Sequence, residues 1–301
     1  GDRSSHNSQS TSQTGGGVLG APDPLSGSSS DNVFTYSVAP KYKLSDRASL
    51  YARVARGYRP GGPNTIPPGA PSNVPLTFGP DRVTSYEVGF KGETVDRTFG
   101  IDAAVYRIDW TDIQLYGVVN NYGVNINGST ARVNGAEVTA TLRPVRGFVT
   151  AINAAYTDAV LTGDTDPQSL GAVDGDRLPF SPKYTVSMSA DYDWDIGNDV
   201  VASVGGTIRS VGEQTGPYDP AYLATVGRFA RIPAYEQVDL RASIDFGRYN
   251  LQAYVKNLTN ARGVTAVLNP TSSGLANYPN DAGAVGIIRP RTIGLSVTAG
   301  F

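Results

Sequence analysis

The 301-residue sequence contains no cysteine and only one histidine, His6. The absence of cysteine excludes disulfides, thiolate metal sites and cysteine nucleophiles. A single histidine in a low-complexity segment argues against a histidine-based catalytic triad and against a histidine-rich metal site. We therefore expect no catalytic residues, no bound metal and no cofactor, and we interpret the protein as a non-enzyme.

Charged residues and long apolar runs are also scarce. Charged residues make up 17% of the sequence and the formal net charge is -2, so no basic field indicates a nucleic-acid partner. No apolar run reaches the ~18 residues of a transmembrane helix. This does not make the chain soluble, because the strands of a membrane barrel hide half of their residues from a hydropathy window. The chain begins without a signal-peptide pattern, and we interpret it as a fragment or a trimmed chain.

What the sequence does contain is period-two alternation, which is clearest over residues 183–209. Every second residue from Tyr184 to Trp194 is apolar, and polar residues lie between them. A turn is predicted at 196–198, after which the alternation resumes. This pattern predicts a β-hairpin with one apolar and one polar face. Aromatic residues beside the turn suit a lipid-facing barrel wall, although a soluble sandwich could carry the same face.

Eleven such segments are predicted along the chain, separated by turns and loops whose lengths alternate. The predicted strands are 32–44, 48–59, 83–93, 97–115, 129–143, 148–161, 183–195, 200–211, 234–246, 249–260 and 291–301. Short turns follow the odd strands, and long loops rich in Gly, Pro and Asn follow the even ones. Such sorting is typical of outer-membrane barrels, and a soluble sandwich has no reason for it. The fold class predicted is therefore all-β, a transmembrane antiparallel β-barrel.

Two further expectations concern the ends of this barrel. Residues 1–31 are rich in Ser and Gly, and we interpret them as a flexible extracellular loop segment before a barrel part at 32–301. Eleven is an odd number, whereas bacterial single-chain barrels have even numbers of strands, and an unpaired edge is costly in a bilayer. We therefore expect further strands before Gly1.

Several segments carry a resemblance to a known family. They are Tyr51–Gly62 (YARVARGYRPGG), Ser85–Lys91 (SYEVGFK), Ala104–Gln114 (AVYRIDWTDIQ), Gly135–Glu137 (GAE), Leu178–Lys183 (LPFSPK), Asn257–Asn260 (NLTN), Arg289–Thr292 (RPRT) and the terminal Phe301. Together, in this order, they resemble the C-terminal barrel of TonB-dependent outer-membrane receptors. The resemblance covers about Tyr36 to Phe301.

The resemblance implies a bacterial outer-membrane barrel of 22 strands, of which this chain would be about the last 11. The plug domain and the segment that contacts the energising protein TonB would lie outside the chain. The implied function is active uptake of a scarce bulky solute, such as a ferric siderophore, a cobalamin-like compound or a glycan. Expected partners are outer-membrane lipid, the TonB complex through the missing N-terminal part, and an iron chelate. A passive porin-like or structural barrel is the alternative, and a soluble β-sandwich binding module is a third reading.

Three groups of residues are candidates for a site. Residues expected to face the lumen, and there to meet the plug or an anionic solute, are Arg53, Arg56, Arg59, Glu137, Asp239 and Arg241. Aromatics expected in extracellular loops are Tyr218, Tyr222 and Phe229. Residues expected in membrane girdles are Trp110, Tyr192, Trp194, Phe246 and Phe301. For the first group we prefer the interpretation as a solvated wall of paired charges, and for the second group ordinary loop packing, over a role in binding. Asp pairs at 164–166 and 174–176 lack the spacing of a calcium loop.

Overall fold

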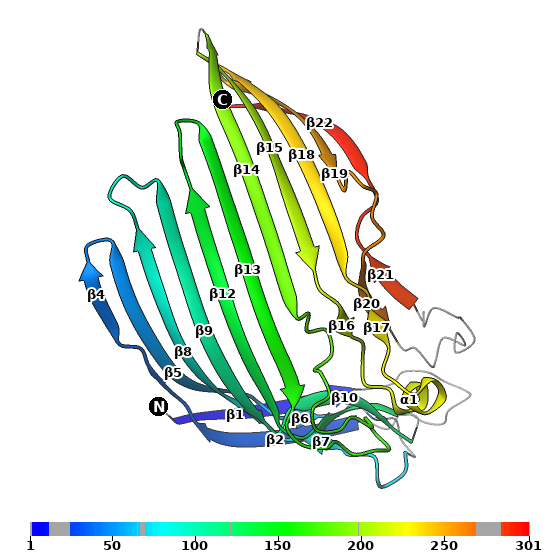
Figure 1. Ribbon diagram of the computed structural model, residues 1–301. Helices are drawn as coiled ribbons and strands as arrows, with labels where there is room; N and C mark the ends of the chain where they lie inside the picture. The colour runs from blue at the N-terminus through cyan, green and yellow to red at the C-terminus, as the bar shows by residue number, and fades with distance from the viewer. Residues whose placement is uncertain are drawn as a thin grey trace.

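The computed structural model describes residues 2–11, 25–64, 66, 70–120, 122–197, 199–268 and 284–300. Within these residues, one antiparallel sheet of 12 strands dominates the molecule (Figure 1). In chain order its strands are β3 (Tyr36–Val38), β4 (Lys41–Ser45), β5 (Ala48–Arg59), β8 (Asp81–Glu93), β9 (Phe99–Thr111), β12 (Ala131–Leu142), β13 (Phe148–Leu161), β14 (Tyr184–Gly197), β15 (Val200–Val211), β18 (Tyr235–Phe246), β19 (Tyr249–Lys256) and β22 (Thr292–Ala299). Each long strand pairs with the next, which confirms the all-β prediction.

The number of strand positions agrees with the sequence pattern. Strands β3 and β4 both pair with β5, so they form one interrupted strand and reduce the 12 strands of the described sheet to eleven positions. The strand predicted over 32–44 is therefore broken, and its first residues end β2 (Leu25–Phe34) instead. In the described part of the chain the sheet is open, with β22 at one edge and β3 and β4 at the other.

The connections are sorted by length, as predicted. Tight turns join β4 to β5, β8 to β9, β12 to β13, β14 to β15 and β18 to β19, and all lie at the upper end of the sheet in Figure 1, here called the turn end. The long connections lie at the opposite, loop end. Gly147 has φ +82° and Gly247 has φ +58°, conformations that glycine adopts without a steric penalty in such turns.

Smaller elements gather at the loop end (Figure 1). They are β1 (Asp2–Thr11), β6 (Gly62–Pro63), β7 (Thr77–Phe78), β10 (Gln114–Val119), β11 (Tyr122–Asn127), β16 (Gln214–Thr215), α1 (Pro220–Val226), β17 (Arg231–Ile232), β20 (Val264–Leu268) and β21 (Ala284–Ile287). Strands β1 and β2 pair with each other. The division of the chain at residue 31 stays a prediction. Among the described residues, no helix is long and apolar enough to cross a membrane.

Alternation gives the main sheet two unlike faces. Across β13, β14 and β15, Ile152, Met188 and Ile208 lie side by side on one face, and each is at least 37% exposed. Leu295 on β22 is 85% exposed. Nothing in the described chain covers this face, here called the apolar face, and so much exposed apolar surface on strands of this length is what a lipid-facing wall requires.

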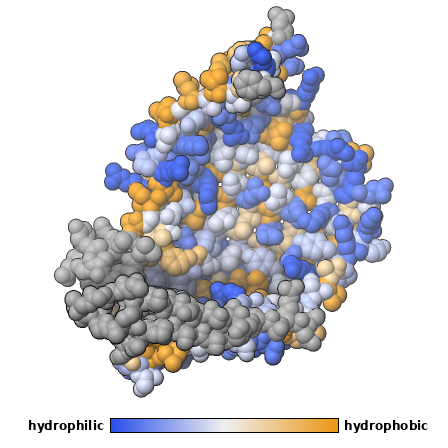
Figure 2. Space-filling model, turned by 180° about the vertical axis from the view of Figure 1, so that it is seen from behind, coloured by the Kyte–Doolittle hydropathy of each residue, from blue (hydrophilic) through white to orange (hydrophobic). Residues whose placement is uncertain are grey.

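The opposite face, here called the polar face, carries ion pairs between strands. Lys91 on β8 pairs with Asp102 on the neighbouring β9, and Arg241 on β18 reaches across β15 to pair with Asp191 on β14. Seen from behind the view of Figure 1, hydrophilic side chains are spread over much of the molecule (Figure 2). The two faces together confirm the alternation predicted from the sequence.

Glycines on the polar face make room for tyrosine rings. Each of three tyrosines lies over the glycine directly opposite it on the neighbouring strand. The pairs are Tyr51–Gly89, Tyr106–Gly135 and Tyr254–Gly294. A Cβ on any of these glycines would lie inside the van der Waals radius of the ring. An aromatic ring over a strand glycine also covers backbone that the glycine would leave exposed.

The buried core lies at the loop end rather than inside the wall. Its main cluster includes Leu161 (0% exposed), Ile113 (1%) and Leu170 (1%), from strand ends and two different loops. Two smaller clusters lie under other loops and centre on Ile66 and Ile232. The loop end is therefore a packed rim, whereas the wall leaves its large side chains exposed.

Candidate functional site

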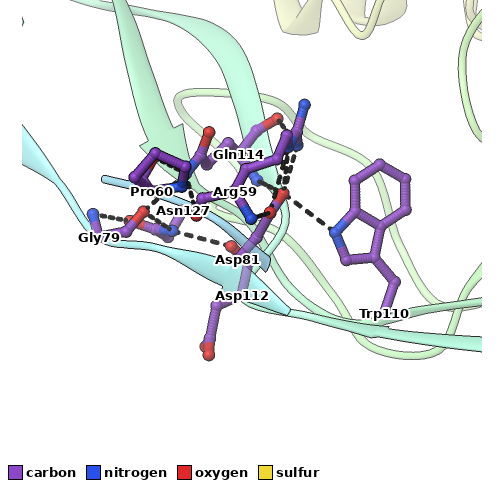
Figure 3. A network of polar contacts seen from close by, with 8 residues as sticks. All are labelled: Arg59, Pro60, Gly79, Asp81, Trp110, Asp112, Gln114 and Asn127. Atoms are coloured by element: carbon purple, nitrogen blue, oxygen red, sulfur yellow. Dashed lines mark hydrogen bonds and ion pairs between the residues drawn. The ribbon is translucent and has the colours of Figure 1, made fainter. Parts of the chain in front are cut away.

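A buried carboxylate organises the rim (Figure 3). Asp81, at the start of β8, is 1% exposed. It accepts hydrogen bonds from the Trp110 indole Nε1 at 3.0 Å and from the Gln114 backbone N–H at 3.3 Å, and it forms an ion pair with Arg59. The Arg59 guanidinium also lies over the Trp110 ring, 5.2 Å from its centre. Buried charge is tolerable here because its oxygens have several donors.

The same network fixes the bases of two long loops (Figure 3). The Gln114 side-chain amide donates to the carbonyl oxygens of Pro60, at 2.9 Å, and Gly79, at 3.0 Å. Asn127 accepts from the Gly79 N–H at 2.6 Å and donates to the Asp112 carbonyl at 2.8 Å. Arg59, Trp110 and Gln114 belong to the segments that carry the family resemblance, so in this structure those segments hold the rim together.

Four of the six predicted lumen residues share the polar face. Arg53 lies opposite Glu87, and Glu137 lies opposite Ala104 in the same part of the sheet. Asp239 and Arg241 lie farther along the sheet on β18. Asp239 accepts hydrogen bonds from the Gln237 side chain at 3.0 Å and from the Asn257 N–H at 2.8 Å. Arg59 is held by Asp81 in the rim.

Arg56 does not lie with these residues. Residues three apart in a regular strand point to opposite faces, and β5 pairs with β8 without a bulge. Arg56 therefore shares the face of Val54 and Leu50 and lies opposite Thr84. The prediction that Arg56 faces the lumen together with Arg53 did not take into account that the two residues are three apart, although the alternation of the sequence shows it.

The polar face also contains a hollow that the sequence did not single out. The hollow has a volume of about 520 Å³, and among its lining residues are Asp102, Glu137, Asn153, Ser187 and Arg209. These side chains come from β9, β12, β13, β14 and β15. The alternation of each strand would have predicted their common face, but only the register shows that they lie at the same height.

The predicted loop aromatics are packed inside the rim. Tyr218 is 7% exposed, its ring centre lies 5.0 Å from that of Phe229, and its hydroxyl donates to the Arg177 carbonyl at 2.8 Å. Burial raises the pKa of the Tyr218 hydroxyl well above its usual range. Tyr222 is 3% exposed in α1. These rings are covered by protein, so in this conformation they support the loops.

The predicted girdle residues divide between the two faces. Tyr192 and Trp194 stack at 5.5 Å on the apolar face beside the turn end, and Phe246 packs there against Tyr249 at 5.7 Å. Trp110 lies on the other face, in the rim. Phe301 is outside the described residues. From Tyr184 to Trp194, β14 advances ten residues, or about 25 Å across a bilayer at ~3.3 Å per residue and a tilt of roughly 40°.

The Asp-rich loop before β14 uses its carboxylates locally. Asp164 accepts from the Asp174 N–H at 2.9 Å, and Asp176 accepts from the Val173 N–H at 2.8 Å. Asp166 accepts from Gln168 and Ser169. Within the described ranges, no group of three or more His, Asp or Glu residues is arranged to hold a metal ion.

Comparison with known proteins identifies the family to which this β-sheet belongs. The family model described as "TonB dependent receptor-like, beta-barrel" matches residues 2–258. The chain belongs to this family. It is 31% identical to the pesticin receptor of Yersinia pestis over 191 residues, and 25% identical to the ferrichrome outer membrane transporter/phage receptor of Escherichia coli K12 over 239 residues.

The structural comparison agrees with this assignment. The crystal structure of the ferric yersiniabactin uptake receptor FyuA from Yersinia pestis superposes with a TM-score of 0.74 at 24% identity, covering 94% of this chain and 40% of that one. The two curated relatives are matched over 64% and 79% of this chain but only 27% and 30% of their own lengths. This TonB-dependent receptor barrel segment thus spans less than half of the proteins it resembles. Like theirs, its location is the bacterial outer membrane.

Proposed function

We propose that the protein takes up a bulky iron chelate of the siderophore type across the outer membrane, with energy supplied through TonB. The observation that carries this proposal is the match to the receptor barrel family over residues 2–258. The names of two relatives also support the proposal. One is a ferrichrome transporter, and the other is a receptor for metal-pseudopaline that is 24% identical over 207 residues. Iron chelates are preferred here to cobalamin-like compounds and glycans on that ground.

This chain would supply part of the wall and of the extracellular mouth. Arg53, Glu137, Asp239 and Arg241 would face the material inside the barrel, whether plug or solute, with residues of the 520 Å³ hollow beside them. The plug and the TonB-contacting segment would come from sequence outside this chain, which would contribute about 11 strands to a barrel of 22. We propose no catalytic role, because uptake needs binding and passage only.

The test is uptake of radioactive ferric chelates by cells that carry the full-length protein as their sole receptor of this type. We expect saturable accumulation that disappears when TonB is deleted. Uptake that is unchanged without TonB would overturn the proposal in favour of the alternative, a passive porin-like or structural barrel. Such a barrel would also give a large steady conductance in planar bilayers.

A further inference from the structure

We propose that the 520 Å³ hollow of the polar face is a binding site for a solute that carries both a positive and a negative group. The site lies halfway down the wall, below the rim. This inference rests on the proposed uptake function and deepens it, because it names the charge type of the solute that the wall accepts on its way through the barrel.

One row of side chains runs along the hollow. Strand register places five residues opposite one another on β9, β12, β13, β14 and β15, and in that order they are Asp102, Thr139, Asn153, Ser187 and Arg209. All five line the hollow. With neighbouring strands ~4.8 Å apart, the row is about 19 Å long. The hollow is therefore elongated across the strands.

The hollow exists because the two middle strands carry small side chains on this face. In the row and on either side of it, the polar-face residues of β13 and β14 are Ala151, Asn153, Ala155, Thr185, Ser187 and Ser189. None of these is charged and none is larger than asparagine. Longer side chains of the same face flank them, such as Tyr106 on β9 and Arg241 on β18. A solute therefore finds room over β13 and β14 and is bounded on both sides.

Two opposite charges at the sides of the hollow have no ion-pair partner among the described residues. They are Glu137 on β12 and Arg209 on β15. Other charges of this face are paired, as in Lys91 with Asp102. Glu137 and Arg209 lie three strands apart, or about 14 Å between backbones. They place a negative and a positive charge on opposite sides of one hollow, and such a field orients a dipolar solute.

The uncharged groups between these two residues can hold the body of the solute. The Thr139 hydroxyl donates to the Asn153 side-chain oxygen at 2.9 Å, which leaves the amide N–H groups of Asn153 as donors. The hydroxyls of Thr185 and Ser187, which also line the hollow, can donate or accept hydrogen bonds. The lining therefore suits a polar solute of low net charge.

The charge balance of the hollow disfavours a polyanion. Its lining contains one arginine, Arg209, and the carboxylates of Asp102 and Glu137. Since Lys91 neutralises Asp102, the remaining charges sum to zero. A chelate with several negative charges would be repelled by Glu137, whereas a zwitterion matches both charges. The geometry assigns the site to chelates that carry an ammonium and a carboxylate group.

The site is separate from the rim. Asn153 lies eight residues before Leu161, whose side chain belongs to the rim core. At ~3.3 Å per residue and a tilt of roughly 40°, Asn153 lies about 20 Å below the rim. A solute held at the rim does not reach Glu137 or Arg209. These two residues should therefore affect passage and leave capture at the cell surface unchanged.

The test compares ferric trihydroxamates that differ only in an end group, which is an ammonium, a carboxylate, or an amino acid that carries both. The metal core of each is neutral, because the three hydroxamates balance Fe³⁺. Cells that carry the full-length protein as their sole receptor of this type take up each chelate labelled with radioactive iron. For the wild type, we expect the maximal uptake rate of the zwitterionic chelate to be at least fivefold higher than that of the other two.

Two variants remove one charge each and keep a polar side chain. Arg209→Gln should lower the maximal rate of the zwitterionic chelate to that of the ammonium chelate, and Glu137→Gln should lower it to that of the carboxylate chelate. The Kd of the chelate on cells without TonB should stay unchanged in both. The matched control Asp193→Asn removes a carboxylate of the same face outside this hollow, and it should change neither the rate nor the Kd.

Folding of each variant is checked by the resistance of the barrel to SDS at room temperature. Equal loss of all three chelates in a folded variant would mean that the residue supports the barrel or holds another protein segment, and would overturn the site. Equal rates of the three chelates in the wild type would overturn the assignment to zwitterions. A wild type that accumulates none of them in a TonB-dependent manner would overturn the proposed uptake function itself, before any variant is compared.

Discussion

The wall and the rim of this molecule keep their shape by different means. In the wall, large apolar side chains remain uncovered, as at Leu295 (85% exposed) and Met188 (48%), and order comes from the strand ladder and from the solvent on each face. In the rim, a few side chains are almost fully buried, such as Asp81 (1%) and Leu161 (0%). The stability of the wall should therefore depend on whether a substituted side chain is polar or apolar. The stability of the rim should depend on which particular side chain is present.

The largest effect is expected in the rim at Asp81. Asp81→Ala leaves the Trp110 indole N–H and the Gln114 backbone N–H without their acceptor, while the Arg59 guanidinium, which is 53% exposed, returns to solvent. Each donor left unsatisfied in the rim costs about 1–3 kcal/mol, so we expect a total loss of about 2–6 kcal/mol. Urea unfolding of the full-length barrel in lipid vesicles measures the loss.

The control is Asp112→Asn, which removes the ion pair with Arg82 and keeps a residue type that tolerates the positive φ of +56° at this position. The Asp112 side chain is 56% exposed, so we expect a cost of about 0–1 kcal/mol. Equal effects of the two substitutions would mean that the rim is not held by the buried carboxylate.

The second prediction contrasts the two faces of the wall on β14. Met188→Lys places a charge near the middle of the apolar face and should destabilise the barrel by about 2–4 kcal/mol in lipid vesicles. Ser187→Lys, one residue earlier, places the same charge on the polar face, where only repulsion from Arg209 directly opposite opposes it, and we expect a loss of less than about 1 kcal/mol. The difference between the urea midpoints of the two variants shows directly which face of β14 contacts lipid. If Ser187→Lys were the more harmful, the assignment of lipid and lumen sides would be reversed.

The third prediction concerns the tyrosine–glycine pairs of the polar face. Gly135→Ala puts a methyl group into the Tyr106 ring, and overpacking of this kind costs about 1–3 kcal/mol. Gly100→Ala on the neighbouring strand is the matched control, since its Cβ would meet only the Gly92 carbonyl oxygen at 3.9 Å. A second substitution, Tyr106→Ser, should remove most of the penalty at Gly135. Additivity of the two changes would show that the ring is not the cause.

The contrast between wall and rim also explains which parts of the fold and of the site could be predicted from the sequence. Period-two alternation and loop lengths predicted the wall strands, because one face meets lipid at every second residue whatever the neighbours are. The same rule, applied strictly, separates Arg56 from Arg53. It could not show that Trp110 belongs to the rim, because that depends on Asp81 and Gln114, which approach it only through the folded loops. For the same reason the sequence left open whether Tyr218 and Tyr222 bind a ligand or pack within the loops, and the structure buries both.

The smallest effect is expected at the turn end, in the exposed turn between β8 and β9. Hydrogen bonds from Thr94 and Thr98 lower the pKa of Asp96 to about 2. A carboxyl group whose pKa is lower in the folded state stabilises it above the unfolded pKa of about 4, and this contribution is lost as the pH falls towards 2. Asp96→Asn removes the titrating group, so the urea midpoint should fall less steeply between pH 4 and pH 2 than in the wild type. Asp46→Asn, in the turn between β4 and β5, controls for the loss of one exposed charge. Parallel pH profiles for wild type and Asp96→Asn would show that the turn hydrogen bonds do not depend on the charged carboxylate, and the turn end would then owe its order to the ladder alone.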